Sequence, residues 1–269
     1  MTILMGLTGA GYLWAAVLSV AAFYDLRRMR WAEYGGVVGW LAQTAWLVAR
    51  GVASHGFPFV TLYDWMGFFV WASVFVYGLV SRWNAWRIAG GFLFPIMFVV
   101  WLVSQTLNHR LGPLPTGLSG PWLDVHIALA TLADVSFLLS AIFGIMYIEK
   151  ERELKQKNVR VFYYRLPPLG ELDQWSARLI GWGWPLFTLA MVTGAIWAKM
   201  VWGQYWSWSP KEVWSLLTWA VYAGYLAARW GLGWRGRRAA YFSMLAFLAV
   251  LVNFWVINLW FHGPHNYNV

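Results

Sequence analysis

The chain lacks cysteine and has few charged residues among its 269 residues. Without cysteine it has no disulfides, thiolate metal ligands or catalytic thiols of its own. Charged residues make up 12% of the composition and hydrophobic residues 60%, far outside the range typical of soluble domains. The composition therefore indicates an integral membrane protein.

The sequence patterns of phosphate-driven and standard hydrolytic enzymes are also missing. No Walker A, HExxH or GxSxG pattern occurs, and we find no internal repeat and no low-complexity linker. None of the five histidines falls at membrane depth, where a b-type electron-transfer subunit would hold its haem. These absences exclude several function classes, and no catalytic residue is assigned.

Apolar runs of about 20 residues, the length that spans a membrane as a helix, recur along the chain. They predict an all-α integral membrane protein with eight transmembrane helices, forming a single transmembrane domain over residues 1–269. The runs lie near 4–24, 35–53, 62–81, 88–107, 122–148, 176–198, 214–230 and 240–261.

Basic residues are distributed unevenly between the predicted loops. Arg27, Arg28 and Arg30 follow the first run, so the positive-inside rule places both termini on the outer side. The first run has no basic segment before it and is expected to remain as an anchor. This orientation places 16 of the 20 basic residues in the cytoplasm. The net charge of +9 then reflects topology and lipid contact, and no nucleic-acid partner is implied.

The most polar stretch, 149–175, is predicted to be a cytoplasmic amphipathic connector that lies along the membrane. It begins as a charged helical extension and is interrupted at Pro167 and Pro168. Its cations are expected to meet lipid phosphates, and a docking surface for another subunit is the alternative.

Six tryptophans lie in the stretch 197–219, WAKMVWGQYWSWSPKEVWSLLTW, between two apolar runs. Scattered tryptophans at a membrane interface are usually anchors in the aromatic belt. Here several indoles share one loop, 199–213, which is predicted to form an apolar shelf suited to a porphyrin on the outer face. The central indoles of this tryptophan-rich loop are Trp202, Trp206 and Trp208.

The residues that follow carry a helix start signal. Ser209 as N-cap, Pro210 at the first helical position and Glu212 at the third match a capping box. A helix is therefore predicted to begin at Pro210. Glu212 serves this cap or has a direct role near the ligand.

The segment 202–219, WGQYWSWSPKEVWSLLTW, resembles the tryptophan-rich WWD motif of the CcsA/ResC cytochrome c biogenesis proteins of system II. The similarity extends to GFPFVTLYDWMGFFVW at 56–71 and to LPPLGELDQWSARLIGWGWPLFTLAMVTGAIWA before the tryptophan-rich loop. The segments LDVHIAL, with His126, and GPHNY, with His265, are similar to the two outer-face histidine segments of that family.

The resemblance implies that the chain binds haem and presents it for covalent attachment to apocytochrome c. His126 and His265 are the implied axial ligands, and His262 is a rival to His265. The haem is expected to be b-type, non-covalently bound and passed on as a substrate. The remaining candidate cofactor-binding residues are the three loop indoles, Trp214, and Lys211 as a cation for the propionates or as an anchor among lipid head groups.

The resemblance further implies a membrane partner of the ResB/CcsB type, with which the chain would form part of a holocytochrome c synthase. The expected location is a bacterial cytoplasmic membrane or a thylakoid-type membrane, with the site on the extracytoplasmic side. The partners are thus this membrane protein, apocytochrome c and the lipid bilayer.

Several positions depart from the family pattern. Ser209 replaces the aspartate of the tryptophan motif, Ala227 stands where a YLHxR-like ending has histidine, and Thr61 and Asp64 replace asparagine and glutamate. Two alternatives stay open: a haem exporter without ligation activity, against which Ala227 counts, and a non-catalytic subunit that docks a protein on its tryptophans. Asp134, inside a predicted span, marks a polar path or pairs with a neighbouring helix.

Overall fold

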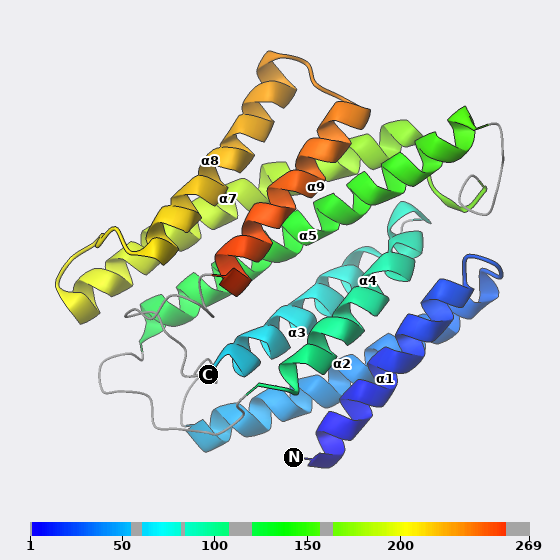
Figure 1. Cartoon of the computed structure of the whole chain (residues 1–269). Helices are drawn as coiled ribbons and strands as arrows, with labels where there is room; N and C mark the ends of the chain where they lie inside the picture. Colours follow the sequence, from blue (N-terminus) through cyan, green and yellow to red (C-terminus); the bar gives the residue numbers. More distant parts are fainter. Residues whose placement is uncertain (1, 55–60, 82–83, 108–119, 157–163, 257–269) are drawn as a thin grey trace. The chain divides into compact units, whose positions relative to one another are not determined.

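The computed structural model describes residues 2–54, 61–81, 84–107, 120–156 and 164–256. These residues form helices joined by short connections, with no β-strand among them (Figure 1). The predicted all-α class is therefore confirmed. The chain divides into two compact units: unit 1 is Met1–Gly112 with Glu149–Glu171, and unit 2 is Pro113–Ile148 with Leu172–Val269.

Six of the described helices are long and apolar enough to cross a membrane, as expected of an integral membrane protein. The runs predicted at 35–53 and 214–230 lie in helices α2 (Arg27–Ser54) and α8 (Pro210–Gly231). Both helices, with 28 and 22 residues, are long enough to cross a membrane, but neither is as apolar as the other six. Eight spanning helices and outward-facing termini therefore stay a prediction, as does the single domain 1–269.

Unit 1 contains α1 (Thr2–Ala21), α2, α3 (Leu62–Val80) and α4 (Asn84–Ser104). Helix α1 packs against both α2 and α4. Its backbone approaches α2 closely, because a Cβ atom on Gly11 would lie 2.6 Å from the backbone nitrogen of Gly39. Small residues commonly allow such close crossings between membrane helices.

A buried ion pair connects α2 to the start of α3. Asp64 accepts hydrogen bonds from the backbone N–H (2.9 Å) and hydroxyl (2.8 Å) of Thr61, the N-cap of α3, and pairs with Arg50 from α2. The Arg50 guanidinium lies 5.4 Å from the Trp46 ring centroid and 5.2 Å from that of Tyr63. Thr61 and Asp64, which differ from the family pattern, therefore form a helix cap and a buried charge pair.

Unit 2 contains most of α5 (Pro121–Lys155) and α7 (Leu169–Trp202), together with α8, α9 (Arg237–Leu251) and the π-helix η1 (Val252–Val256). Phe137 of α5 stacks on Tyr222 of α8 with ring centroids 3.6 Å apart. The Ser140 hydroxyl donates to the backbone carbonyl of Ser176 at 3.0 Å, which joins α5 to α7. The core of unit 2 therefore brings α5, α7 and α8 together.

Parts of the predicted connector 149–175 are described, and they form hydrogen bonds within the connector and to the turn after α1. Lys150 donates to the carbonyl of Leu166 at 2.5 Å. Arg165 donates to the carbonyls of Phe23 and Tyr24, both at 3.2 Å, in the turn after α1. These two cations are engaged with backbone oxygens, and the amphipathic connector along the membrane stays a prediction.

Candidate functional site

The tryptophan-rich loop lies between α7 and α8, and its first residues extend α7 as far as Trp202. The rings of Trp197 and Trp202 contact edge to face, with centroids 4.9 Å apart and planes at 73°. Trp206 and Trp208 do the same at 5.9 Å and 84°. Within each pair, the edge of one indole therefore covers part of the face of the other.

Trp208 is the most unusual residue of this loop. Its φ of +58° lies in the left-handed region, which costs a non-glycine residue about 1–2 kcal/mol. Its side chain is nevertheless 71% exposed. Local backbone strain of this kind clusters at binding sites, so Trp208 is a candidate contact residue for a ligand.

The start of α8 fixes the end of this loop. Ser209 is the N-cap and forms a complete capping box with Glu212, as predicted, and Pro210 is the first helical residue. The Glu212 carboxylate accepts from the backbone N–H groups of Ser207 and Ser209 and from the Ser207 hydroxyl, each at 2.9 Å. Glu212 therefore holds the segment next to Trp208 in place.

His126 lies in the second turn of α5 and packs against α7. Its Nδ1 lies 2.6 Å from the carbonyl oxygen of Ala190, so in neutral imidazole this nitrogen carries the proton and donates. A Cβ atom on Gly194, one turn further along α7, would lie 2.8 Å from the same nitrogen. The missing side chain at residue 194 therefore makes room for the ring. Nε2 then keeps the lone pair that a metal ion requires.

Lys211 lies in the first turn of α8 and is partly buried. Its charge acts electrostatically on both His126 and Asp134 of α5. Both roles predicted for Asp134, a polar path and pairing with a neighbouring helix, stay predictions. The predicted contact between Lys211 and haem propionates stays a prediction.

The remaining predicted site residues are placed as follows. Trp214 is partly buried on α8, and Ala227, in place of the family histidine, is exposed on the same helix. His265 and its rival His262 lie outside the described residues. Among the residues that are described, no group of three or more His, Asp or Glu side chains is arranged to hold a metal ion. Of the predicted iron ligands, His126 is therefore the one that lies within the described residues.

Sequence reasoning missed the contribution of α7 to this site. Ala190 and Gly194 form a small-xxx-small pair in the sequence AMVTG, a spacing that allows another helix to approach closely. From the sequence alone, this spacing could have indicated that a bulky side chain from a neighbouring helix packs against α7. The site therefore draws on α5, α7 and α8, with the tryptophan-rich loop joining the last two.

Comparisons with known proteins cover most of the chain. Residues 59–265 match the family model described as cytochrome C assembly protein, a span that includes His126, the tryptophan-rich loop and His265. Cytochrome c biogenesis protein CcsA of Guillardia theta is 31% identical over an alignment 267 positions long, which covers 91% of this chain and 88% of that protein. CcsA of Gloeobacter violaceus is 29% identical over an alignment of 317 positions, which covers 98% of this chain and 92% of that protein. CcsA of Heterosigma akashiwo is 30% identical over an alignment of 246 positions, which covers 78% of this chain and 76% of that protein.

Proposed function

This chain belongs to the cytochrome c assembly protein family, and we propose that it binds haem at the outer face of the membrane and presents it to apocytochrome c. The resemblance inferred from the tryptophan and histidine segments is thereby confirmed at the level of the family. The observation that carries the proposal is the packing and hydrogen bonding of His126 against α7. One ring nitrogen is held by α7, and the other is left for iron.

The hydrogen bond to Ala190 supports a ligand role for His126. Metal-binding histidines almost always donate their second ring N–H to an oxygen, which fixes the tautomer and raises the basicity of the ligating nitrogen. The carbonyl of Ala190 provides this oxygen at 2.6 Å. His126 is then one axial ligand of a b-type haem, with His265 as the other and His262 as its rival.

The charge distribution of unit 2 supports an outer-face site. His126 and the tryptophan-rich loop lie at one end of the α5, α7 and α8 bundle, and the basic connection between α8 and α9 lies at the other (Figure 1). That connection and the first turn of α9 contain Arg235, Arg237 and Arg238. The positive-inside rule assigns this basic end to the cytoplasm and the tryptophan end to the opposite side.

The proposed chemistry is positional. A cysteine thiol of apocytochrome c adds across a haem vinyl group: a C–S bond forms and the thiol hydrogen passes to the other vinyl carbon. No oxidant or reductant is consumed, so the task of this chain is to hold the haem with its vinyl edge accessible. The thiols come from apocytochrome c, and a ResB/CcsB-type membrane protein is the proposed partner.

Visible spectroscopy of the detergent-purified chain, with and without its co-purifying partner, tests this proposal. We expect the wild type to show a low-spin, bis-histidine haem spectrum that His126→Ala loses. His109→Ala, which changes a histidine outside both family segments, serves as the control and retains the spectrum. Comparison of His262→Ala with His265→Ala identifies the second ligand.

A cavity variant separates loss of a ligand from loss of the fold. Imidazole added to His126→Gly is expected to restore the low-spin spectrum, because it can occupy the space of the missing side chain. A wild-type preparation without haem, both alone and with its partner, would instead favour a non-catalytic subunit that docks a protein on its tryptophans.

A further inference from the structure

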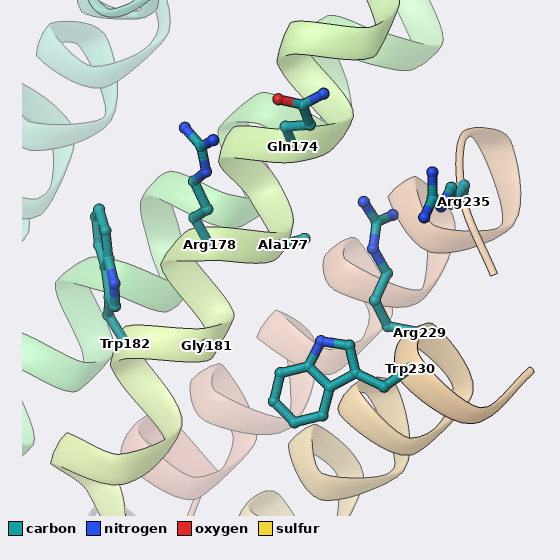
Figure 2. A pocket seen from close by; sticks show the side chains of 8 residues that line it. All are labelled: Gln174, Ala177, Arg178, Gly181, Trp182, Arg229, Trp230 and Arg235. Carbon is teal, nitrogen blue, oxygen red and sulfur yellow. The ribbon is translucent and has the colours of Figure 1, made fainter. Parts of the chain in front are cut away.

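At the end of unit 2 opposite the tryptophan-rich loop, α7, α8 and the connection after α8 border an open hollow of about 420 Å³. Figure 2 shows the guanidinium groups of Arg178, Arg229 and Arg235 on its upper side, with the indoles of Trp182 and Trp230 below them. The hollow therefore combines a positively charged side with an aromatic side.

One carboxylate organises the charged side. The two oxygens of Asp173 each accept a 2.7 Å hydrogen bond from Arg229, and Oδ1 also accepts from the backbone N–H of Gly236 at 2.8 Å. Arg229 also donates to the carbonyl of Trp234 at 3.2 Å. Asp173 of α7 therefore fixes both the end of α8 and the connection that carries Arg235.

The other two arginines keep their charge available to a ligand. Arg178 and Arg235 are exposed, and neither forms an ion pair within the described part of the chain. Arg178 lies 5.1 Å from the ring centroid of Trp175, a contact that leaves its N–H donors accessible. No carboxylate is found among the described residues that line the hollow, and the charge of Asp173 is matched by Arg229.

We propose that this hollow binds the phosphate headgroup of an anionic phospholipid. The guanidinium fork matches phosphate oxygens, and basic pockets between transmembrane helices accept such headgroups. Trp182 and Trp230 are 55% and 75% exposed, as indoles at the level of lipid headgroups commonly are. A net negative lipid fits better than a zwitterionic one, because the lining offers no carboxylate to a choline or ethanolamine group.

The test measures binding of phosphatidylglycerol to the delipidated full-length chain with its co-purifying partner, by native mass spectrometry in detergent. Phosphatidylcholine is the zwitterionic comparison. The variant Arg178→Gln/Arg235→Gln removes two charges from the hollow and leaves the Asp173–Arg229 pair intact. The control Arg237→Gln/Arg238→Gln removes two exposed charges from the start of α9, outside the hollow.

We expect the double variant in the hollow to bind phosphatidylglycerol about 25-fold more weakly than wild type, or about fivefold for each arginine, and the control to bind as wild type does. Equal weakening in both double variants, or none in either, overturns the proposal. Inorganic phosphate tests the source of the anion: displacement of the lipid at millimolar phosphate would assign the hollow to a free phosphate. Displacement by protoporphyrin IX would assign it to a porphyrin.

Discussion

The packing of His126 against α7 leads to a prediction for Gly194→Ala. The added Cβ atom would lie 2.8 Å from Nδ1 and 2.9 Å from Cε1 of the imidazole, whereas ordinary contacts begin near 3.4 Å. The ring must therefore move away by roughly half an ångström or more, which weakens its hydrogen bond to Ala190. Overpacking of this kind costs about 1–3 kcal/mol, and the hydrogen bond contributes about 1 kcal/mol.

A second glycine of the same helix provides a matched control. A Cβ atom on Gly181 would meet no atom within 4 Å, so Gly181→Ala gains about 1 kcal/mol of helix propensity without a clash. Gly194→Ala receives the same gain and also the overpacking cost. The difference in unfolding free energy between the two variants, about 1–3 kcal/mol, therefore isolates the contact with His126.

Thermal unfolding and visible spectra of both variants, purified in the same detergent, provide the readout. We expect Gly194→Ala to unfold at a lower temperature than Gly181→Ala and to lose part of the low-spin haem signal. Equal unfolding temperatures together with equal spectra would refute the placement of His126 against α7, and with it the argument that Ala190 fixes the imidazole.

Three further predictions concern charges and the tryptophan-rich loop. Asp64→Asn leaves the buried guanidinium of Arg50 without its ion pair, so we expect the unfolding free energy measured by chemical denaturation to fall by about 3–5 kcal/mol. Asp25→Asn, which removes the exposed pair with Arg28, serves as the control and is expected to cost under about 1 kcal/mol. Glu212→Ala leaves the backbone N–H groups of Ser207 and Ser209 without their acceptor. It should cost about 1–2 kcal/mol and speed proteolysis of the loop, and unchanged proteolysis would contradict the role assigned to this carboxylate. Trp208→Gly should relieve about 1 kcal/mol of backbone strain yet weaken haem binding, whereas Trp208→Phe keeps the strain and part of the aromatic contact; haem titration of both variants distinguishes these effects.

Some local features of the site were predictable from the sequence, because residues close together in the chain determine them. The start of α8 at Pro210 is set by Ser209 and Glu212, which lie within one helical turn, and the capping box was predictable for that reason. The left-handed backbone of Trp208 was not predictable, because a tryptophan gives no local preference for positive φ. It depends on the hydrogen bonds that the residues on either side, Ser207 and Ser209, donate to Glu212.

Contacts between distant segments were predicted less well. His126 was singled out from its segment, but its partner Ala190 is 64 residues away and contributes only a backbone oxygen. Apolar runs indicate which segments are helices and leave the rotation of each helix about its axis open. For that reason the sequence indicated neither that Lys211 acts on Asp134 nor that Arg50 pairs with Asp64.

The hydrogen bonds from Arg165 to the carbonyls of Phe23 and Tyr24 can form only after the ribosome has synthesised residue 165. Unit 1 contains Glu149–Glu171 as well as Met1–Gly112, so the ribosome must synthesise most of α5 before the last piece of this unit exists. The four N-terminal helices are therefore synthesised while the turn after α1 still lacks its guanidinium. A nascent chain that stops before Arg165 should expose this turn to protease, and one that extends past α7 should protect it.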